Sequence, residues 1–243
     1  MKTVVITGAG AGLGRAMARR MAGAGYYVIL LGRTLSRLKD LEAELAPNAR
    51  ALACDVSSPD SVRTAFAEIA ARKSEIDVLI NNAATYEPSL ATEARDDQIL
   101  DPILTNLAGP IYTARSAVPM LARGGHIINI SSESVAMNFP MLSLYQASKA
   151  GLERFTAALR AEVESSGIKV TLVRAGTMYD EDAKSSWEPE VHKRFAEACL
   201  KAAIDLRARP ISHYKSIAGV IQAIVEAPGD VNMPQVSLEG FRA

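Results

Sequence analysis

The sequence predicts an α/β fold, a three-layer sandwich with a seven-stranded parallel sheet and helices on both faces. Short apolar segments alternate with segments of helical periodicity from one end of the chain to the other. The first apolar segments lack the polar residue at every second position that a half-exposed strand carries, so these strands should be buried on both faces. Because right-handed crossovers place helices on both faces of a parallel sheet, the two observations together predict the sandwich.

Seven segments are expected to form strands, and six are expected to form helices. The strands are expected at 3–7, 27–31, 50–53, 78–80, 126–130, 169–173 and 235–238, and the helices at 13–24, 35–45, 60–73, 96–122, 143–166 and 213–226. Ser58 and Pro59 mark the start of the third helix, because proline is tolerated in a first turn that a serine caps. Gly167 is expected to end the fifth helix.

Length and composition fit one domain over residues 1–243. Of the 243 residues, 49% are hydrophobic and 22% are charged, which supplies a sizeable core. Lys plus Arg and Asp plus Glu number 27 each, so the balanced charge gives no reason to expect nucleic acid or a membrane as a partner. The sequence shows no signal peptide and no apolar stretch of about 20 residues, so a cytoplasmic location is expected.

The cysteines and histidines form no metal-binding pattern. Cys54 and Cys199 are expected to be free, buried thiols. His126, His192 and His213 have no carboxylate or cysteine at ligand spacing, so no metal site is expected.

Residues 177–210 are the least regular part of the chain, and a substrate lid is expected there because the stretch follows the sixth strand. Its apolar side chains fit two interpretations, lining a substrate pocket or packing the lid onto the domain. These are Met178, Tyr179, Trp187 and Phe195. Its cations would suit an acidic substrate, but nearby carboxylates offset them and favour a solvated helix face. The cations are Lys184, Lys193, Arg194, Lys201, Arg207 and Arg209, and the carboxylates are Glu181, Asp182, Glu188, Glu190 and Glu197.

The stretch Gly8-x-x-x-Gly12-x-Gly14 lies between the first strand and the first helix. A turn without side chains allows a pyrophosphate to approach the helix N-terminus, where unpaired amides and the helix dipole favour an anion. A tight turn that serves packing alone is the alternative, because a glycine motif by itself is weak evidence.

Arg33 and Thr34 follow the second strand, where folds that bind the unphosphorylated dinucleotide carry an acid. A guanidinium beside a hydroxyl would bind a 2′-phosphate by charge-assisted hydrogen bonds, whereas a carboxylate would repel it. The sequence therefore predicts NADP(H) in preference to NAD(H). A solvated surface arginine is the alternative interpretation.

Tyr145 and Lys149 lie four residues apart, on one face of a predicted helix. An adjacent ammonium lowers the pKa of a tyrosine from its usual value near 10, which would allow Tyr145 to act as general acid or base. A surface Tyr–Lys pair is the alternative. Ser132 favours the catalytic interpretation, since it follows a strand at the edge where open sheets bind ligands and its hydroxyl could contact an oxyanion. Asn81 and Asn82 end a second strand near the expected path of a cofactor.

These residues resemble the short-chain dehydrogenase/reductase family in its single-domain form of roughly 250 residues. The motifs that carry the resemblance run in the family's order over nearly the whole chain. They are Thr7-Gly8-x-x-x-Gly12-x-Gly14, Asp55-Val56, Asn82-Ala83-Ala84, Asn106, Ser132 and Tyr145-x-x-x-Lys149.

The resemblance implies a Rossmann-like fold and hydride transfer between a nicotinamide cofactor and a carbonyl or secondary alcohol. It makes Tyr145 the acid/base, Ser132 the donor that orients the carbonyl, and Lys149 the residue that holds the nicotinamide ribose. Asn106 would lie at a break in its helix and anchor water in a proton relay, and Asp55 would contact the adenine. The expected cofactor residues are Gly8, Gly12, Leu13, Gly14, Arg33, Thr34, Asp55, Val56, Asn82, Ala83, Tyr145, Lys149, Gly176 and Thr177.

The chain departs from the family pattern after the sixth strand. Ala175 replaces a proline, and Asp180 stands where a threonine that contacts the carboxamide is common, with Thr177 as the available substitute. Ala11 stands where many NADP-binding members carry a basic residue, so the NADP prediction depends mainly on Arg33.

Two other functions compete with a reductase, a non-redox epimerase or dehydratase and a non-catalytic NADP(H)-binding or sensing protein. The glycine spacing and the lack of an added C-terminal substrate domain disfavour the first. The complete set Asn106, Ser132, Tyr145 and Lys149 disfavours the second. The resemblance also implies a homotetramer or homodimer that is assembled through the helices at 96–122 and 143–166.

Overall fold

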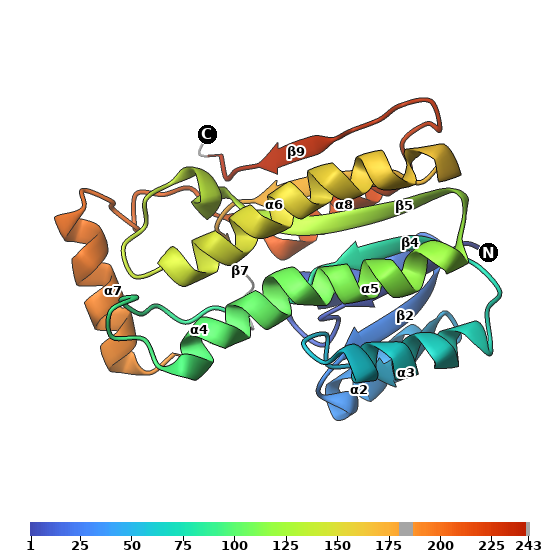
Figure 1. Ribbon diagram of the computed structural model, residues 1–243, viewed down its shortest axis with the longest axis horizontal. Coiled ribbons are helices and arrows are strands. Elements are labelled where there is room, and N and C mark those ends of the chain that lie inside the picture. The colour runs from blue at the N-terminus through green and yellow to red at the C-terminus, as the bar shows by residue number, and fades with distance from the viewer. Residues whose placement is uncertain (180–186, 242–243) are drawn as a thin grey trace.

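The computed structural model describes residues 1–179 and 187–241, and it contains the predicted seven-stranded parallel sheet (Figure 1). Asp180, Glu181, Asp182 and Lys184 lie outside the described residues. The strands are β1 Thr3–Thr7, β2 Tyr27–Gly32, β3 Ala49–Ala53, β4 Ile76–Asn81, β5 Leu121–Ser132, β6 Lys169–Ala175 and β9 Gln235–Leu238. The Rossmann-like fold class is therefore confirmed.

The strand order, β3-β2-β1-β4-β5-β6-β9, places the start of the chain in the middle of the sheet. Val5 in β1 is level with Ile29 in β2 on one side and with Leu79 in β4 on the other. The chain runs outward from β1 to β3 and then returns to β4, so the loops after β1 and β4 diverge at the carboxyl edge. Open sheets bind ligands at this kind of switch point.

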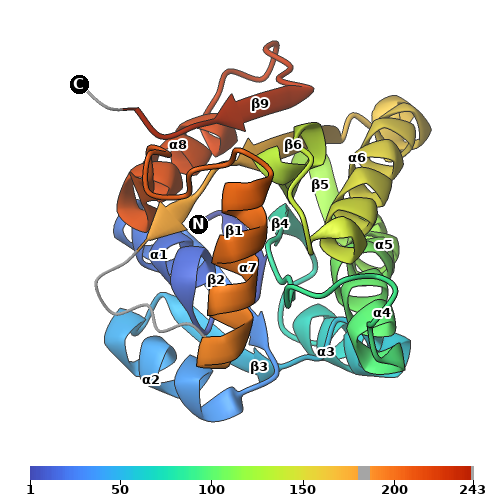
Figure 2. The ribbon, with the colours of Figure 1, turned by 90° about the vertical axis from the view of Figure 1, so that its left-hand side faces the viewer.

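Helices cover both faces of the sheet, as Figure 2 shows in an end-on view. They are α1 Gly12–Gly23, α2 Leu35–Leu45, α3 Pro59–Ala70, α4 Asp96–Ile103, α5 Gly109–Ala117, α6 Ser143–Val163, α7 Pro189–Lys201 and α8 Tyr214–Val225. One apolar core joins the sheet to α1, α2 and α8, and a second joins the opposite face to α3, α5 and α6. Among the described helices, none is long and apolar enough to cross a membrane.

The predicted helix signals operate as expected at two positions. The Ser58 hydroxyl accepts a hydrogen bond from the Ser61 amide at 3.3 Å, next to Pro59 in the first turn of α3. Gly167 adopts φ +71° just after α6, a left-handed conformation that favours glycine.

The predicted helix at 96–122 is wrong in its continuity. It divides into α4, a π-helical turn at Leu104–Ala108, α5 and a short 3-10 turn at Val118–Met120. Leu121 already belongs to β5 and pairs with Ile76 in β4, so β5 begins earlier than the sequence predicted.

The stretch after β6 is more regular than expected. Strand β7 (Met178–Tyr179) pairs in parallel with β8 (Ser212–His213), and α7 lies between them in the sequence. Helix α7 lies across the carboxyl edge of the sheet, where Figure 2 shows it in front of the strand ends. Phe195 and Cys199 of α7 pack there with Phe139, Met141 and Leu142, forming a third apolar cluster.

Candidate active site

The glycine turn after β1 is built so that its backbone segments touch. Gly8 has φ +66°, and a Cβ there would lie 2.9 Å from the Ala83 Cα. A Cβ on Gly14 would overlap the Gly8 carbonyl and would lie 2.7 Å from Nδ2 of Asn82. Gly14 lines neither of the cavities described below, so its lack of a side chain serves the approach of α1 to the turn.

Thr7 and Asn82 hold this turn against the end of β4. The Thr7 hydroxyl accepts hydrogen bonds from the amides of Asn82 and Ala83, both at 3.0 Å. In return, the Asn82 side-chain amide donates to the Thr7 carbonyl at 3.0 Å. Asn81 points the other way, because its amide bonds Asn129 at 2.9 Å inside the core. Of the two neighbouring asparagines, only Asn82 reaches the expected cofactor path.

A cavity of about 280 Å³ opens between the glycine turn and the ends of β2 and β3. It is lined by Gly8, Ala11, Gly12, Gly32, Arg33, Cys54, Asp55, Val56, Asn82, Ala83, Ala84 and Thr105. The Asp55 carboxylate accepts hydrogen bonds from the amide and hydroxyl of Ser57, at 3.0 and 2.7 Å. Thr34 is exposed at the N-cap of α2 and does not line this cavity, in contrast to Arg33.

A second cavity, of about 440 Å³, continues from the first past Asn82 and Ala84. Most of the expected site residues that do not line the first cavity line this one. They are Leu13, Ser132, Tyr145, Lys149, Gly176 and Thr177. Three of the four expected catalytic residues therefore share one cavity with the expected nicotinamide contacts, whereas Asn106 lines neither cavity.

Tyr145 occupies the first turns of α6, and burial raises the pKa of its phenol to about 12. A hydrogen bond with Ser132 lowers that pKa in part, and the neighbouring Tyr86 raises it. The tyrosine is therefore protonated at neutral pH, and its bond with Ser132 lets the two hydroxyls address a single oxygen atom.

Lys149 is one turn further along α6 and is only 3% exposed. Burial lowers the pKa of its ammonium to about 8. Its Nζ donates to the Ile130 carbonyl at 2.7 Å and lies 5.9 Å from the centre of the Tyr145 ring. The expectation that Lys149 lowers the pKa of Tyr145 is wrong for this structure, because desolvation of the phenol dominates and the ammonium is directed to a backbone carbonyl.

Asn106 lies in the π-helical turn and is fully buried, so its helix does break at this residue. Its side chain bonds the backbone of Thr85 in both directions, accepting from the amide and donating to the carbonyl, each at 2.8 Å. It also donates to the Ser148 hydroxyl at 3.0 Å, and that hydroxyl bonds the Tyr145 carbonyl. The Asn106 side chain thus joins the loop after β4 to the turn of α6 that carries Tyr145.

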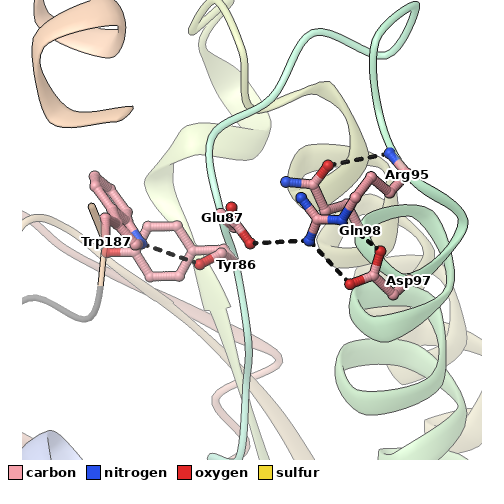
Figure 3. Close-up of polar contacts among 6 residues, drawn as sticks. All are labelled: Tyr86, Glu87, Arg95, Asp97, Gln98 and Trp187. Carbon is pink, nitrogen blue, oxygen red and sulfur yellow. Dashed lines mark hydrogen bonds and ion pairs between the residues drawn. The ribbon is translucent and has the colours of Figure 1, made fainter. Parts of the chain in front are cut away.

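Aromatic side chains form the outer wall of the second cavity. The ring centres of Tyr86 and Tyr145 are 5.0 Å apart, and Trp187 meets Tyr86 edge-on at 5.1 Å. The Trp187 indole donates to the Tyr86 carbonyl at 3.3 Å (Figure 3). Phe195 of α7 meets the other side of Trp187 at 5.9 Å. The apolar residues after β6 were expected either to line a pocket or to pack the lid onto the domain. Trp187 and Phe195 do both, since they line the cavity and pack in the third apolar cluster.

Charged side chains secure the loop between β4 and α4, which carries Tyr86. Arg95 contacts Asp97 at 2.9 Å and Glu87 at 4.0 Å, as Figure 3 shows. Glu93 of the same loop pairs with Arg194 of α7 at 2.8 Å. The loop and α7 are thus joined across the mouth of the cavity.

Glu133 and Arg209 bring an ion pair to the second cavity. Glu133 follows Ser132, and its Oε1 lies 2.6 Å from the Arg209 guanidinium. The same oxygen accepts from the amide and hydroxyl of Thr177, at 3.1 and 3.2 Å. The expectation of a solvated helix face is therefore wrong for Arg209, because the chain after α7 folds back along the cavity wall.

Sequence reasoning missed several wall residues, and of its two interpretations for Tyr179 the structure contradicts only the one that lines the pocket. The missed residues are Tyr86, Glu133, Phe139, Leu142, Leu206 and Tyr214. Tyr179 is 42% exposed and packs on His213, outside the cavity wall. No spacing rule connects these positions, since they are brought together by loops. Hydrophobic residues directly after β4 and β5 were the available signal.

The two joined cavities fit a dinucleotide. The N-cap of α1 is Ala11, which makes no side-chain cap, so backbone amides face the cavity floor with no acidic residue in the first turn. Gly12, with φ +50°, lets the backbone reach that floor. Uncapped amides at a helix N-terminus suit a pyrophosphate, and the switch point of a doubly wound sheet is where such a group binds.

Comparison with known proteins identifies the family. A model of the short chain dehydrogenase family matches residues 2–191. Carbonyl reductase family member 4 from Danio rerio is 34% identical over 180 residues, which cover 73% of this chain and 76% of that protein. The 3-oxoacyl-(acyl-carrier-protein) reductase of Bos taurus is 30% identical over 207 residues, covering 84% and 87%. The closed form of serine dehydrogenase complexed with NADP+ has 26% identity and a TM-score of 0.85, covering 97% of this chain and 94% of its own.

The chain belongs to the short-chain dehydrogenase/reductase family, as its motifs predicted. It is therefore an NAD(P)-dependent dehydrogenase/reductase, an oxidoreductase that transfers hydride.

Proposed function

We propose that the protein is an NADP(H)-dependent oxidoreductase that reduces a carbonyl group to a secondary alcohol, with Tyr145 as the acid/base. The observation that carries this proposal is the convergence of Ser132, Tyr145 and Lys149 on one cavity, which continues into the cavity at the glycine turn. When bound, the cofactor supplies the hydride, and this chain binds, orients and protonates the substrate.

In the proposed reaction the substrate oxygen accepts hydrogen bonds from Ser132 and Tyr145. As negative charge develops on that oxygen, Tyr145 transfers its proton to it. A phenol with its pKa raised to about 12 carries the required proton at neutral pH, which supports the acid role. For oxidation the same phenol would have to be ionised, at a larger free-energy cost.

Lys149 and Asn106 are proposed to serve proton supply and positioning. Because the pKa of Lys149 is lowered to about 8, its ammonium can give up and regain a proton near neutral pH. Asn106 fixes the loop at Thr85 and, through Ser148, the first turns of α6. A water held near the π-helical turn would then return a proton from solvent to Tyr145.

The preference for NADP(H) over NAD(H) is proposed from Arg33. Its exposed side chain lines the cavity on the side of β2, where the 2′-phosphate of a bound dinucleotide would lie. The serine dehydrogenase structure with TM-score 0.85 holds NADP+, which supports the same choice. Thr34, one residue further, would add its hydroxyl by a small movement of the α2 N-cap.

We further propose a single domain in which residues 177–210 act as the substrate lid, and a homotetramer or homodimer as the assembled form. Exposed apolar residues on the helical segment 96–117 support an interface there, namely Leu100, Ile103, Leu104 and Ile111, which are 37 to 51% exposed. Sedimentation equilibrium tests the assembly, and a monomer at micromolar concentration would contradict it.

The test of the function is oxidation of NADPH by the purified protein with ketones, aldehydes, quinones and keto acids, followed by absorbance. We expect turnover with at least one class, and faster turnover with NADPH than with NADH. Tight NADPH binding without turnover in the whole panel would instead favour the non-catalytic NADP(H)-binding protein.

A further inference from the structure

The structure places a fixed cation in the substrate cavity. Arg209 lies between α7 and β8 and lines the same wall as Ser132, Tyr145 and Thr177. Its side chain is 21% exposed. Most of that wall is apolar or aromatic, so a guanidinium there loses much of its hydration and needs a reason to be present.

Two contacts set the orientation of the Arg209 guanidinium. Glu133 holds one end through its Oε1 at 2.6 Å. The flat group also lies over the Phe139 ring, with Cζ 5.3 Å from the ring centre. Because the same Glu133 oxygen is tied to Thr177, the cation is coupled to the loop that follows β6 and is held near the expected nicotinamide end of the cavity.

Most of the hydrogen-bonding capacity of Arg209 is unused. A guanidinium has five N–H donors, and among the described residues the only recorded acceptor is Glu133. Its Nε is buried and has no hydrogen-bond partner within residues 1–179 and 187–241. Unmatched donors beside an open cavity are expected where a ligand brings the acceptor.

The charge of the cavity wall has the sign that suits an anion. Among the described lining residues the ionisable cations are Lys149 and Arg209, and the carboxylate is Glu133. Lys149 is directed to the Ile130 carbonyl, so Arg209 is the cation available to a substrate. Bidentate hydrogen bonding to a planar carboxylate is the recognition that a guanidinium supports best.

We propose that Arg209 binds a carboxylate on the substrate, so that the natural substrates are oxo acids, or hydroxy acids in the reverse direction, with an apolar body. This inference rests on the proposed carbonyl reductase function. The carboxylate takes no part in bond changes: hydride adds to the carbonyl carbon, the Tyr145 proton adds to its oxygen, and the acid group stays anchored. Phe139, Trp187, Phe195 and Leu206 would contact the apolar body.

Three oxo acids, each paired with a methyl ester that lacks the charge and adds one methyl group, test this proposal. They are phenylpyruvate, benzoylacetate and benzoylpropionate, each compared with its methyl ester in NADPH oxidation. We expect at least one acid to have a kcat/KM about tenfold or more above that of its ester. Arg209→Met should lower kcat/KM for that acid about 30-fold, mainly by raising KM, and should change the ester less than threefold. Arg209→Lys, which keeps the charge, should retain a preference for the acid.

Arg63→Met is the matched control, because Arg63 is also paired with a carboxylate, that of Asp60, yet lies on α3 and lines neither cavity. It should change neither substrate more than twofold. If Arg209→Met lowers acid and ester alike, or if wild-type protein prefers every ester, Arg209 only fastens the segment after α7 and the proposal is wrong.

A binding measurement separates this proposal from the reductase function. Trp187, the single tryptophan of the chain, lines the cavity, so its fluorescence reports occupancy by unreactive probes. With NADP+ present, phenylacetate should bind about tenfold more tightly than phenylacetamide, and Arg209→Met should remove that difference. This result without any turnover would refute the reductase and keep the anion site, whereas equal binding of the two probes would refute the anion site itself.

Discussion

The walls of the two cavities differ in composition. The cavity at the glycine turn is walled largely by backbone and short side chains, which come from the ends of β1, β2, β3 and β4. The substrate cavity is walled by large side chains from separate loops, among them Tyr86, Phe139, Trp187 and Arg209. The wall of the first cavity tolerates few substitutions, because its backbone segments are in close van der Waals contact. The wall of the substrate cavity can accept different side chains and still enclose the cavity.

This difference shows how one chain can keep its cofactor and vary its substrate. A methyl group added at Gly8, which lines the first cavity, would lie 2.9 Å from the Ala83 Cα, and that backbone cannot move aside without disturbing the turn. By contrast, Trp187 and Phe195 pack mainly on other side chains, which can take new rotamers. Tyr145 lines the second cavity and not the first, so a change there tests whether the two cavities are separable.

The largest effect is expected from Tyr145→Phe, which keeps the ring packed on Tyr86 and removes the transferable proton. Turnover should fall about a thousandfold, within the range that a general acid contributes. The Kd for NADPH, measured by its fluorescence on binding, should change less than threefold. A comparable loss in both measurements would mean that the two cavities are one functional unit, and retained turnover would exclude Tyr145 as the acid.

The next effect tests the rigid side by a matched pair of glycine substitutions. Gly14→Ala should lower the free energy of unfolding by about 2–3 kcal/mol, because the new methyl overlaps the Gly8 carbonyl. Gly10→Ala places its Cβ 3.6 Å from Arg37 and Leu38, an ordinary contact, and should change stability by less than about 0.5 kcal/mol. Urea denaturation measures both. Similar costs for the two variants would show that the close approach of α1 to the glycine turn at Gly14 does not limit stability.

Arg33→Ala should weaken binding in the cofactor cavity without affecting the substrate cavity, which makes it a further test of whether the two cavities are separable. Loss of charge-assisted hydrogen bonds to a 2′-phosphate is worth about 1.5–3 kcal/mol, so the Kd for NADPH should rise about 10- to 100-fold. The Kd for NADH should change less than twofold, and KM for the carbonyl substrate should stay the same. Equal weakening of NADPH and NADH would refute the assigned role of Arg33.

The smallest effect is a pH dependence that arises from Lys149 in the substrate cavity. The pKa of Lys149 is lowered to about 8, so its charge is present below that pH and is lost above it. Tyr145 keeps its proton throughout, since its pKa is raised to about 12. The kcat/KM for reduction should therefore fall about threefold from pH 7.5 to 8.5. Lys149→Arg, which stays charged, should show no such fall, and a profile that is unchanged by this substitution would assign the titration to another group.

The accuracy of the sequence-based predictions also differs between the cofactor side and the substrate side. The strand at 3–7 and the strand at 235–238 match β1 and β9 at both ends, because the apolar run of β1 and the polar–apolar alternation of β9 are local signals. The helix at 96–122 was predicted as continuous, because periodicity does not reveal that the Asn106 amide binds Thr85 and Ser148 and thereby stabilises a π-helical turn. Burial, likewise, sets the pKa of Tyr145 against the direction that its spacing from Lys149 predicts.

On the substrate side, prediction failed where distant segments meet. Arg209 was assigned to solvent because neighbouring carboxylates balance its charge along the chain. In the structure its partner is Glu133, which precedes it by 76 residues. No periodicity or spacing connects two such positions, so the partner of a charged residue in this region becomes visible only in the folded chain.

The positions of the two cysteines allow the opening of two regions of the protein to be followed separately. Both thiols are free and buried, with Cys54 in the wall of the first cavity and Cys199 on the buried face of α7. Burial raises both thiol pKa values, that of Cys54 to about 11, so a thiol reagent attacks each one only when its surroundings open. The rates of alkylation at the two positions would therefore time the opening of each region separately, in the unmodified enzyme. Bound nucleotide should slow the alkylation of Cys54, and a bound substrate should slow the alkylation of Cys199.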